Sequence, residues 1–242
     1  HYSMSKKATI YDIAKELNIT AATVSRALNN NPKISEKTRE LVLATATKLN
    51  YKQNRLALAL KSGKSKNVGV VVPFINKNFF ASVIRGIEDE LYPKGFHVII
   101  SQTYEDTTRE KKIIQNLLNA QVDGILLSTA FTEQNKEEFR ESLKKNTPFI
   151  LFDRVLRFKE ISTVTIDDYQ GGFKATEHLI LQGCKRIAHF DVDQSIELYK
   201  HRFKGYKDAL AKYNLPYRHE YVISLKSNME AGKDAAEKLM NL

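Results

Sequence analysis

The chain has 242 residues, which is long enough for two domains with a sizeable buried core. Its net charge of +10 is unevenly distributed, because residues 1–66 carry 13 Lys and Arg against 4 Asp and Glu, whereas the rest of the chain carries 25 against 24. A small basic region attached to a neutral one predicts nucleic-acid binding at one end only, and it argues against a uniformly basic, membrane-binding chain.

Residues 9–29 have the pattern of two short helices joined by a turn. Thr9 and Asp12 form a capping box that starts the first helix, and Asn18 tolerates the left-handed conformation that the turn needs. Thr20 caps the second helix. Helical spacing places the following residues on the inner faces: Ile10, Ile13, Ala14, Leu17, Ile19, Val24, Ala27 and Leu28.

The outer face of the second helix carries small residues around one arginine, which suits close approach to a grooved polyanion. The pattern therefore indicates a helix-turn-helix whose recognition helix is 21–29. Two short amphipathic helices around a polar turn also occur in many other helical domains. The local positive charge and a third helix, opened by Ser35, favour DNA binding. We expect this third helix to bury Leu41, Val42 and Leu49.

The next region, 53–66, contains a short helix-permitting segment with leucines on more than one face. Seven residues, Asn54 to Leu60, are too few for a stable isolated helix, since helices shorter than about 12–15 residues are marginal in water. A polar linker follows from Lys61. We therefore divide the chain into a headpiece (1–52), a hinge helix and linker (53–66) and a third region (67–242).

From Asn67 onward strands and helices alternate, which predicts an α/β domain of parallel sheets with helices on both faces. The expected strands are 67–73, 96–102, 124–128, 149–152, 163–166, 186–190 and 221–224. The expected helices are 79–92, 107–120, 133–145, 169–182, 197–213 and 229–242, with Thr107 and Glu110 as the capping box of the second. Ligands of such sheets bind beyond the carboxyl ends of the strands, so the candidate loops are 73–79, 102–106, 128–132, 153–158, 167–171 and 191–202.

Along its whole length the chain resembles the lac-repressor family of bacterial transcription regulators. The resemblance rests on TIYDIAKELNITAATVSRALNN, ISEKTRELVLATATKLNY, NRLALALKSGKS, VGVVVPFINKNFF, FDR at 152–154, DDYQGG at 167–172 and RFKGY at 202–206. It implies an all-α helix-turn-helix headpiece followed by a periplasmic-binding-protein-like domain of two lobes. The N-lobe would span about 67–162 and the C-lobe would start at about 163. Since family members run further, we expect the second lobe to be truncated and incomplete.

The resemblance also implies roles at the DNA. Ala21, Ala22 and Arg26 would read bases in the major groove, and Arg26, with guanine as its best partner, would supply the main hydrogen-bonded readout. Leu60 would enter the minor groove and kink the DNA, with the hinge helix folding only on binding. Gln53 and Leu58 depart from a common proline and arginine. Residues at the phosphates would be Thr9, Tyr11, Thr20, Thr23, Ser25, Asn29 and Tyr51.

In the effector domain the resemblance implies that Asp153, Arg154 and Arg202 hydrogen-bond a sugar or similar polyol, with Phe79 and Tyr169 as an aromatic wall. The alternatives are ion pairs for the charged residues and core packing for Phe79. The resulting hypothesis is a ligand-responsive repressor of carbohydrate-utilisation genes that binds a pseudo-palindromic operator in double-stranded DNA as a homodimer. A solute-binding protein and a sugar-metabolising enzyme with a fused headpiece are the alternatives.

The sequence offers little support for catalysis, a cofactor or a bound metal. Ser62 to Ser65 ends like a phosphate loop but lacks the earlier glycine and precedes its strand instead of following it. The histidines show no metal-ligand spacing, and the adjacent Asp167 and Asp168 are expected to cap the next helix. The single cysteine, Cys184, excludes a disulfide framework, and we expect it to be a small buried hydrophobe. Without an apolar membrane span or signal sequence, we expect a cytoplasmic, nucleoid-associated protein.

Overall fold

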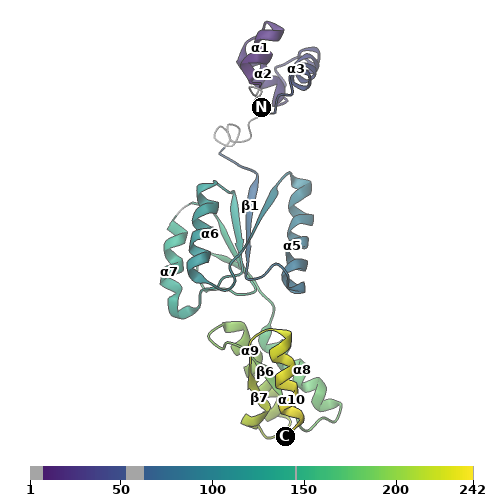
Figure 1. Cartoon of the computed structure of the whole chain (residues 1–242), viewed down its shortest axis with the longest axis vertical. Coiled ribbons are helices and arrows are strands. Elements are labelled where there is room, and N and C mark those ends of the chain that lie inside the picture. Colours follow the sequence, from purple (N-terminus) through teal and green to yellow (C-terminus); the bar gives the residue numbers. More distant parts are fainter. Residues whose placement is uncertain (1–7, 53–62, 145, 242) are drawn as a thin grey trace, which may run out of the picture. The chain divides into compact units, whose positions relative to one another are not determined.

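The computed structural model describes residues 8–52, 63–144 and 146–241 (Figure 1). The chain divides into two compact units, His1–Gly63 and Lys64–Leu242. The first is helical, and the second contains two parallel sheets. The predicted fold class, a helix-turn-helix region followed by an α/β domain, is confirmed.

The first unit consists of three helices around one small core. The Thr9–Asp12 capping box is present, Asn18 has a φ of 50°, and the Thr20 hydroxyl accepts a hydrogen bond from the Thr23 N–H at 3.1 Å, all as predicted. The helices are α1 (Ile10–Leu17), α2 (Ala21–Leu28) and α3 (Glu36–Lys48). Their buried apolar residues are Ile13, Ala14, Val24, Ala27, Val42 and Ala46.

The prediction that Leu41 lies inside this core is wrong, because its side chain is 50 % exposed. The inner face of α3 instead runs through Val42, Thr45, Ala46 and Leu49, at positions i, i+3, i+4 and i+7. Leu41 precedes that series by one residue and is therefore rotated by about 100° away from the core.

The larger sheet of the second unit is parallel throughout, with strand order β2-β1-β3-β4-β5. Helix α5 covers one face and helices α6 and α7 cover the other (Figure 1). The strands are β1 (Asn67–Val72), β2 (His97–Gln102), β3 (Gly124–Leu127), β4 (Phe149–Phe152) and β5 (Ser162–Val164). The helices are α5 (Asn78–Leu91), α6 (Thr107–Asn119) and α7 (Lys136–Arg140), with 3₁₀ turns at Tyr92–Lys94, Glu133–Asn135 and Glu141–Lys144.

The two faces of this sheet bury different side chains of the same strands. Val70 and Val72 pack with Phe80 and Ile84 of α5, whereas Val71 belongs to the cluster on the opposite face. Such alternation along a strand that is buried on both sides explains the continuous valine run of β1. Parallel strands place all their carboxyl ends at one edge, where the loops that follow them gather.

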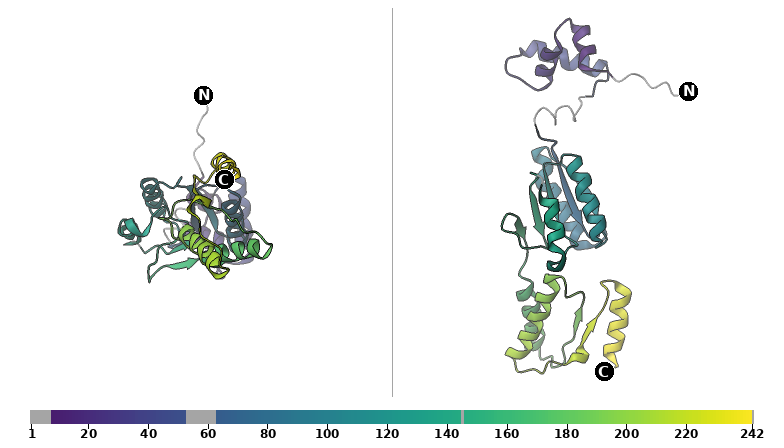
Figure 2. Two further views of the ribbon diagram at one scale, coloured as in Figure 1. Left: turned by 90° about the horizontal axis from the view of Figure 1, so that it is seen from below. Right: turned by 90° about the vertical axis from the view of Figure 1, so that its left-hand side faces the viewer.

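The smaller sheet pairs β6 (His189–Asp191) with β7 (Val222–Ser224) in parallel. Helices α8 (Asp168–Leu181) and α9 (Glu197–Lys212) lie on one side of it and α10 (Met229–Met240) on the other (Figure 2). A 3₁₀ turn spans His219–Tyr221. Tyr206, which is 1 % exposed, packs with Ile187 and donates a hydrogen bond to its carbonyl at 2.9 Å.

Helices α8 and α9 approach each other at two glycines. A Cβ at Gly172 would lie 2.2 Å from the carbonyl oxygen of Arg202, and one at Gly205 would lie 2.2 Å from that of Tyr169. Only glycine therefore fits at this crossing, which explains why DDYQGG and RFKGY carry glycine at these positions. The contact fixes Arg202 against the start of α8.

Four further predictions differ from the structure. Asp106, not a Thr107–Glu110 box, caps α6, and Glu110 turns inward instead. The expected helix 133–145 is broken, because Thr132 and Asn135 close a separate first turn. The expected strand 186–190 begins only at His189, where the pairing with Val222 begins. Cys184 is exposed, because it lies in the turn after α8 and outside the core.

Candidate functional sites

Helix α2, the predicted recognition helix, presents a small, polar outer face around Arg26. Arg26 and Ala22 are exposed, and the Asn29 side chain donates to the Ser25 carbonyl at 2.7 Å at the end of the helix. Thr20 and Thr23 share a hydrogen bond of 2.9 Å between their hydroxyls at its start. Ala21 is half-buried and packs against the core, so less of it faces outward than expected.

The other DNA-contact candidates lie at the edges of the same unit. Thr9 is exposed at the start of α1 and Tyr11 is 72 % exposed on it. Tyr51 follows α3 and packs against the headpiece core, so it is half-buried. Leu60, together with Gln53 and Leu58, lies outside the described residues.

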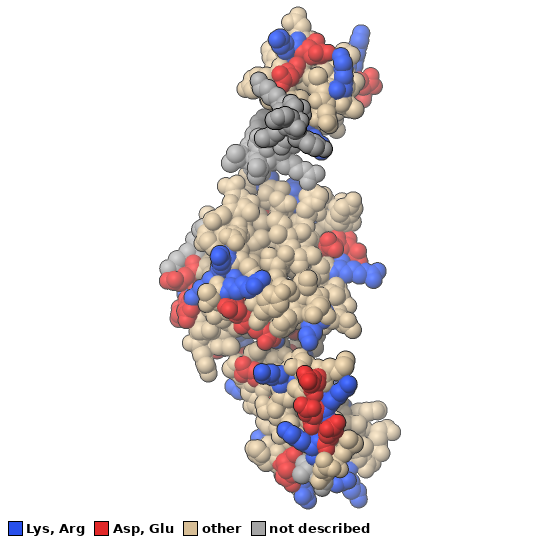
Figure 3. Space-filling model, viewed as in Figure 1, with Lys and Arg blue, Asp and Glu red and all other residues tan. Residues whose placement is uncertain are grey.

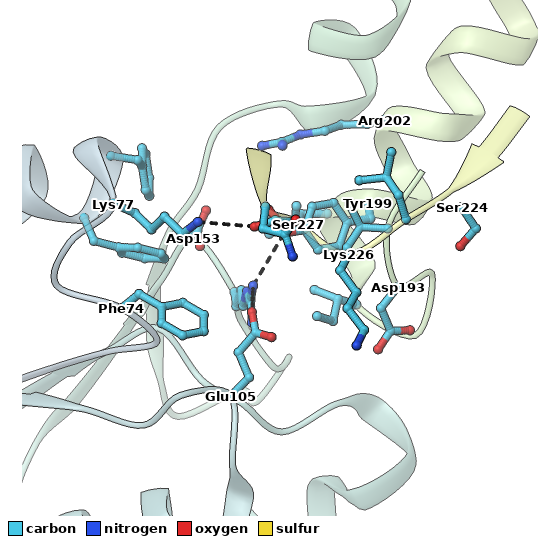
Figure 4. Close-up of a pocket in the computed structure, with 18 of the residues that line it drawn as sticks. Phe74, Lys77, Glu105, Asp153, Asp193, Tyr199, Arg202, Ser224, Lys226 and Ser227 are labelled. Carbon is cyan, nitrogen blue, oxygen red and sulfur yellow. Dashed lines mark hydrogen bonds and ion pairs between the residues drawn. The ribbon is translucent and has the colours of Figure 1, made fainter. Parts of the chain in front are cut away.

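The second unit contains a cleft of about 1180 Å³ lined by loops that follow strands of both sheets. Four of the five effector-site candidates line it: Phe79, Asp153, Arg154 and Arg202. Figure 4 labels Asp153 and Arg202 among these lining residues. The fifth, Tyr169, lies outside the cleft, where its hydroxyl donates to Asp208 at 3.0 Å. The cleft therefore lies where the sequence predicted a ligand site, beyond the carboxyl ends of the strands.

Asp153 and Arg154 reach the cleft directly from the carboxyl end of β4. Asp153 has a φ of 59° and accepts a hydrogen bond from the Ser128 hydroxyl at 3.2 Å. Burial raises the pKa of the Asp153 carboxyl, and the adjacent Arg154 opposes that shift. The Arg154 guanidinium donates to Glu105 at 2.6 Å and to the Tyr199 hydroxyl at 3.4 Å.

Arg202 enters the cleft from α9. Its Nε donates to a carboxylate oxygen of Asp168 at 2.7 Å, and Asp168 itself is buried. Both cleft arginines thus hold an ion pair, as the alternative interpretation of the sequence allowed, while they also line the cavity. Guanidinium groups fixed in this way present their remaining N–H donors in a defined direction.

Tyr199 is a cleft residue that lies in the predicted candidate loop 191–202 but was not itself predicted to bind the ligand. Its ring centroid lies 5.9 Å from the guanidinium carbon of Arg154 and 5.9 Å from that of Arg202. The available signal was its position one helical turn before Arg202, which places both on one face of α9. Phe79, which is 51 % exposed, meets Phe80 edge to face, so Phe79 is not a core residue.

The loop after β7 supplies the other part that the sequence did not reveal. Residues 224–228 line the cleft, and the Ser227 carbonyl accepts a hydrogen bond from the Lys77 ammonium at 3.2 Å (Figure 4). Lys77 directly precedes α5. Charged, amide and aromatic groups thus surround a cavity that could hold a polar organic molecule with several hydroxyl groups.

Two family models together match nearly all of the chain. The model described as bacterial regulatory proteins of the lacI family matches residues 9–54. The model described as periplasmic binding proteins and sugar binding domain of LacI family matches residues 65–242. The chain belongs to the LacI family.

Individual relatives agree with this assignment. The LacI-family chain is 37 % identical over 235 residues to catabolite control protein A of Priestia megaterium, an alignment that covers 96 % of this chain and 70 % of that protein. It resembles the structure of the transcriptional regulator CelR in complex with cellobiose, with a TM-score of 0.64, 26 % identity and coverage of 97 % and 71 %. The lac repressor dimer bound to operator and the anti-inducer ONPF shares the fold, with a TM-score of 0.84, 23 % identity and coverage of 98 % and 71 %.

These relatives are transcription regulators and not enzymes, and this LacI-family chain is a DNA-binding transcription regulator. Within the described residues, no three His, Cys, Asp or Glu side chains are grouped as a metal site would require. None of the described helices has the length and apolar character needed to cross a bilayer. In the view of Figure 3, acidic side chains lie next to basic ones wherever charges gather on the α/β unit, in keeping with its near-neutral composition, and a broad area between these groups carries no charged side chains.

Proposed function

We propose that this regulator is a ligand-responsive repressor of carbohydrate-utilisation genes that binds a pseudo-palindromic operator as a homodimer. Its regions would be the headpiece 1–52, the hinge 53–66 and the effector-binding and dimerisation domain 67–242. The observation that carries the proposal is the cleft, because Asp153, Arg154 and Arg202 all line it and the Tyr199 ring lies near both arginines. Ligand-fixing polar groups beside an aromatic ring suit a sugar or a sugar derivative.

On the DNA, Arg26 would recognise a base while the surrounding residues hold the helix in the groove. The side chains offered to bases are those of Ala21, Ala22 and Arg26, and only the arginine has hydrogen-bond donors for a base edge. Thr9, Tyr11, Thr20, Thr23, Ser25, Asn29 and Tyr51 would contact the phosphates or be positioned against them. Leu60 would enter the minor groove at the centre of the operator.

Ligand control would act through the hinge. A ligand that changes the angle between the two lobes changes the spacing of the paired hinge segments, so the two Leu60 side chains fit or miss the minor groove. The coupling is reciprocal, because operator binding must change ligand affinity by the same factor.

The proposed place of Leu60 in the minor groove can be tested by replacing it with serine. This substitution should weaken operator binding and reduce DNA bending, whereas unchanged bending would exclude the minor-groove role.

Arg26→Ala tests the proposed base contact. We expect a cost of about 1–3 kcal/mol confined to one base pair of each half-site, because a bidentate contact to guanine is lost. Binding selection from a randomised operator library measures this cost. The matched control is Lys37→Ala, an exposed cation on α3, which should leave the preferred sequence unchanged. An equal loss on every sequence would show that Arg26 contacts phosphate only.

Cellobiose and D-ribose, within a panel of mono- and disaccharides, test the proposed effector class by thermal shift. A ligand that binds the folded state raises its melting temperature by mass action. Arg202→Ala should abolish the shift, and Tyr169→Phe, outside the cleft, should not. A sugar that binds without changing gel-shift affinity for DNA would instead support a solute-binding role. No shift with any sugar would contradict the carbohydrate assignment.

A further inference from the structure

Glu110 is a buried carboxylate that has no place in the proposed DNA or ligand contacts. It lies on α6 and is 0 % exposed. One carboxylate oxygen accepts a hydrogen bond from the Thr129 hydroxyl at 2.6 Å, and the other accepts one from the Ala130 N–H at 2.7 Å. Both donors belong to the segment 128–131, which follows β3, so the two hydrogen bonds to Glu110 hold that segment against α6.

The same segment holds the two cleft residues after β4. The Ser128 hydroxyl donates to the Asp153 carboxylate at 3.2 Å, and the Thr129 N–H donates to the Arg154 carbonyl at 3.2 Å. Ser128 and Thr129 are 0 % and 1 % exposed, so solvent does not compete for these hydrogen bonds. A continuous series of contacts therefore connects Glu110 to both Asp153 and Arg154.

We propose that Glu110 is a positioning residue for the cleft: by holding Thr129 and Ala130 it orients Asp153 and Arg154, and its protonation is transmitted to them. The proposal rests on the proposed ligand-binding role of Asp153 and Arg154. Its physical part, the connection between the three residues, exists whether or not a ligand binds.

Protonation of Glu110 changes the contacts that it can make. The ionised carboxylate accepts from both donors, whereas the acid form must itself donate from one oxygen. If the acid proton of Glu110 points at the Ala130 N–H, two hydrogen-bond donors face each other and no hydrogen bond can form between them. A proton directed at the Thr129 hydroxyl reverses the hydrogen bond there: the Thr129 oxygen, which already accepts from the Phe131 N–H at 3.1 Å, then accepts from Glu110 as well, and its own proton must turn away. Either arrangement therefore changes one of the two hydrogen bonds to the segment.

The charges around Glu110 allow this change near neutral pH. Burial raises the pKa of Glu110 to about 7, with the two hydrogen bonds and the positive charge of Arg154 acting in the opposite direction. The neighbouring cations of α6 are engaged elsewhere: Arg109 donates to the Gln102 carbonyl, and Lys111 pairs with Glu138 of α7. Arg154 is thus the charged group through which the cleft and Glu110 influence each other.

Amide NMR of the whole chain between pH 5.5 and 8.5, without ligand, tests the connection. The amide signals of Ala130, Asp153 and Arg154 should share one inflection near pH 7, and Glu110→Gln should remove it from all three. The matched control is Asp123→Asn. Asp123 also accepts from two backbone amides, those of Ser65 and Lys66 at 2.8 and 3.0 Å, but these belong to the segment before β1, so all three inflections should remain.

Ser128→Ala is the second variant, and it tests the link itself. It removes the hydroxyl that joins the segment to Asp153 but leaves the hydrogen bond from the Thr129 N–H to the Arg154 carbonyl, so Ala130 and Arg154 should keep their inflections while that of Asp153 becomes smaller. An inflection that persists in Glu110→Gln, or an Asp153 signal unaffected by Ser128→Ala, would overturn the inference. The outcome is independent of sugar binding, because a chain that binds no sugar can still show the shared inflection, and a failed titration leaves the sugar proposal intact.

Discussion

Glu110 should make the stability of the α/β unit depend on pH in an unusual direction. Its pKa rises from 4.5 to about 7 on folding, so the folded state binds more protons than the unfolded state between these values. The free energy of unfolding therefore falls as the pH rises from about 5 to 8, by up to about 3 kcal/mol. In Glu110→Gln the side chain does not titrate, so the free energy of unfolding should not show this decrease.

Urea unfolding at pH 5 and pH 8, followed by circular dichroism because the chain has no tryptophan, measures the effect. The informative quantity is the difference between the wild type and Glu110→Gln. Burial lowers the pKa of His189, which weakens the fold at low pH in both proteins alike and cancels in the difference. A difference that is the same at both pH values would contradict a buried, titrating Glu110.

For single residues, the sequence correctly predicted interactions between residues that are close together in the chain. Thr9, Asn18 and Thr20 take their expected roles because capping and left-handed turns depend on neighbouring backbone groups. Glu110 was misassigned because a glutamate three residues after a threonine has the same spacing in a capping box and on a buried helix face. Only the packing of the segment after β3 against α6 distinguishes the two.

At the scale of elements, the crossing of α8 and α9 is the most constrained contact. Gly205→Ala should destabilise the α/β unit by about 1–3 kcal/mol, because the added methyl meets backbone atoms that cannot move aside. Gly171→Ala is the matched control in α8. Its Cβ would meet nothing within 4 Å, so we expect a gain of up to about 1 kcal/mol from helix propensity.

Denaturant midpoints at constant pH separate these two outcomes. Equal effects of the two substitutions would show that the helices do not approach as closely as the structure places them. Thermal-shift measurements on Gly205→Ala should also show weaker sugar binding, because the crossing positions Arg202 against Asp168. If Gly205→Ala is destabilised but its melting temperature still rises with sugar as much as that of the wild type, the helix crossing does not determine ligand binding in the cleft.

Strand and helix order was predictable because apolar runs and periodicity are local signals, and β4 matches its predicted range, 149–152. The ends of β6 were not predictable, since they are set by pairing with β7, a strand about thirty residues later. Tyr199 was missed for the same reason. Its place between Arg154 and Arg202 depends on how α9 packs beside the end of β4.

At the scale of the whole molecule, the two compact units have separate hydrophobic cores. Ile13→Ala should therefore reduce hydrogen-exchange protection in residues 8–52 without affecting β1 and β3, at a cost of about 2–5 kcal/mol. Leu127→Ala, equally buried at 0 % exposed, should do the reverse. Loss of protection in both units from either substitution would show that they unfold together.

The absence of any side chain between α8 and α9 at Gly172 and Gly205 limits how the protein can respond to an occupied cleft. Elsewhere in a core, a shifted side chain is absorbed when its neighbours change rotamer. Here the backbones are in contact, so a displacement of Arg202 is expected to move α8 and α9 together. Helix α8 begins four residues after the end of β5, next to the connection between the two sheets. If a ligand binds in the cleft as proposed, it would therefore act on the angle between the two sheets through the main chain, with little loss to side-chain rearrangement.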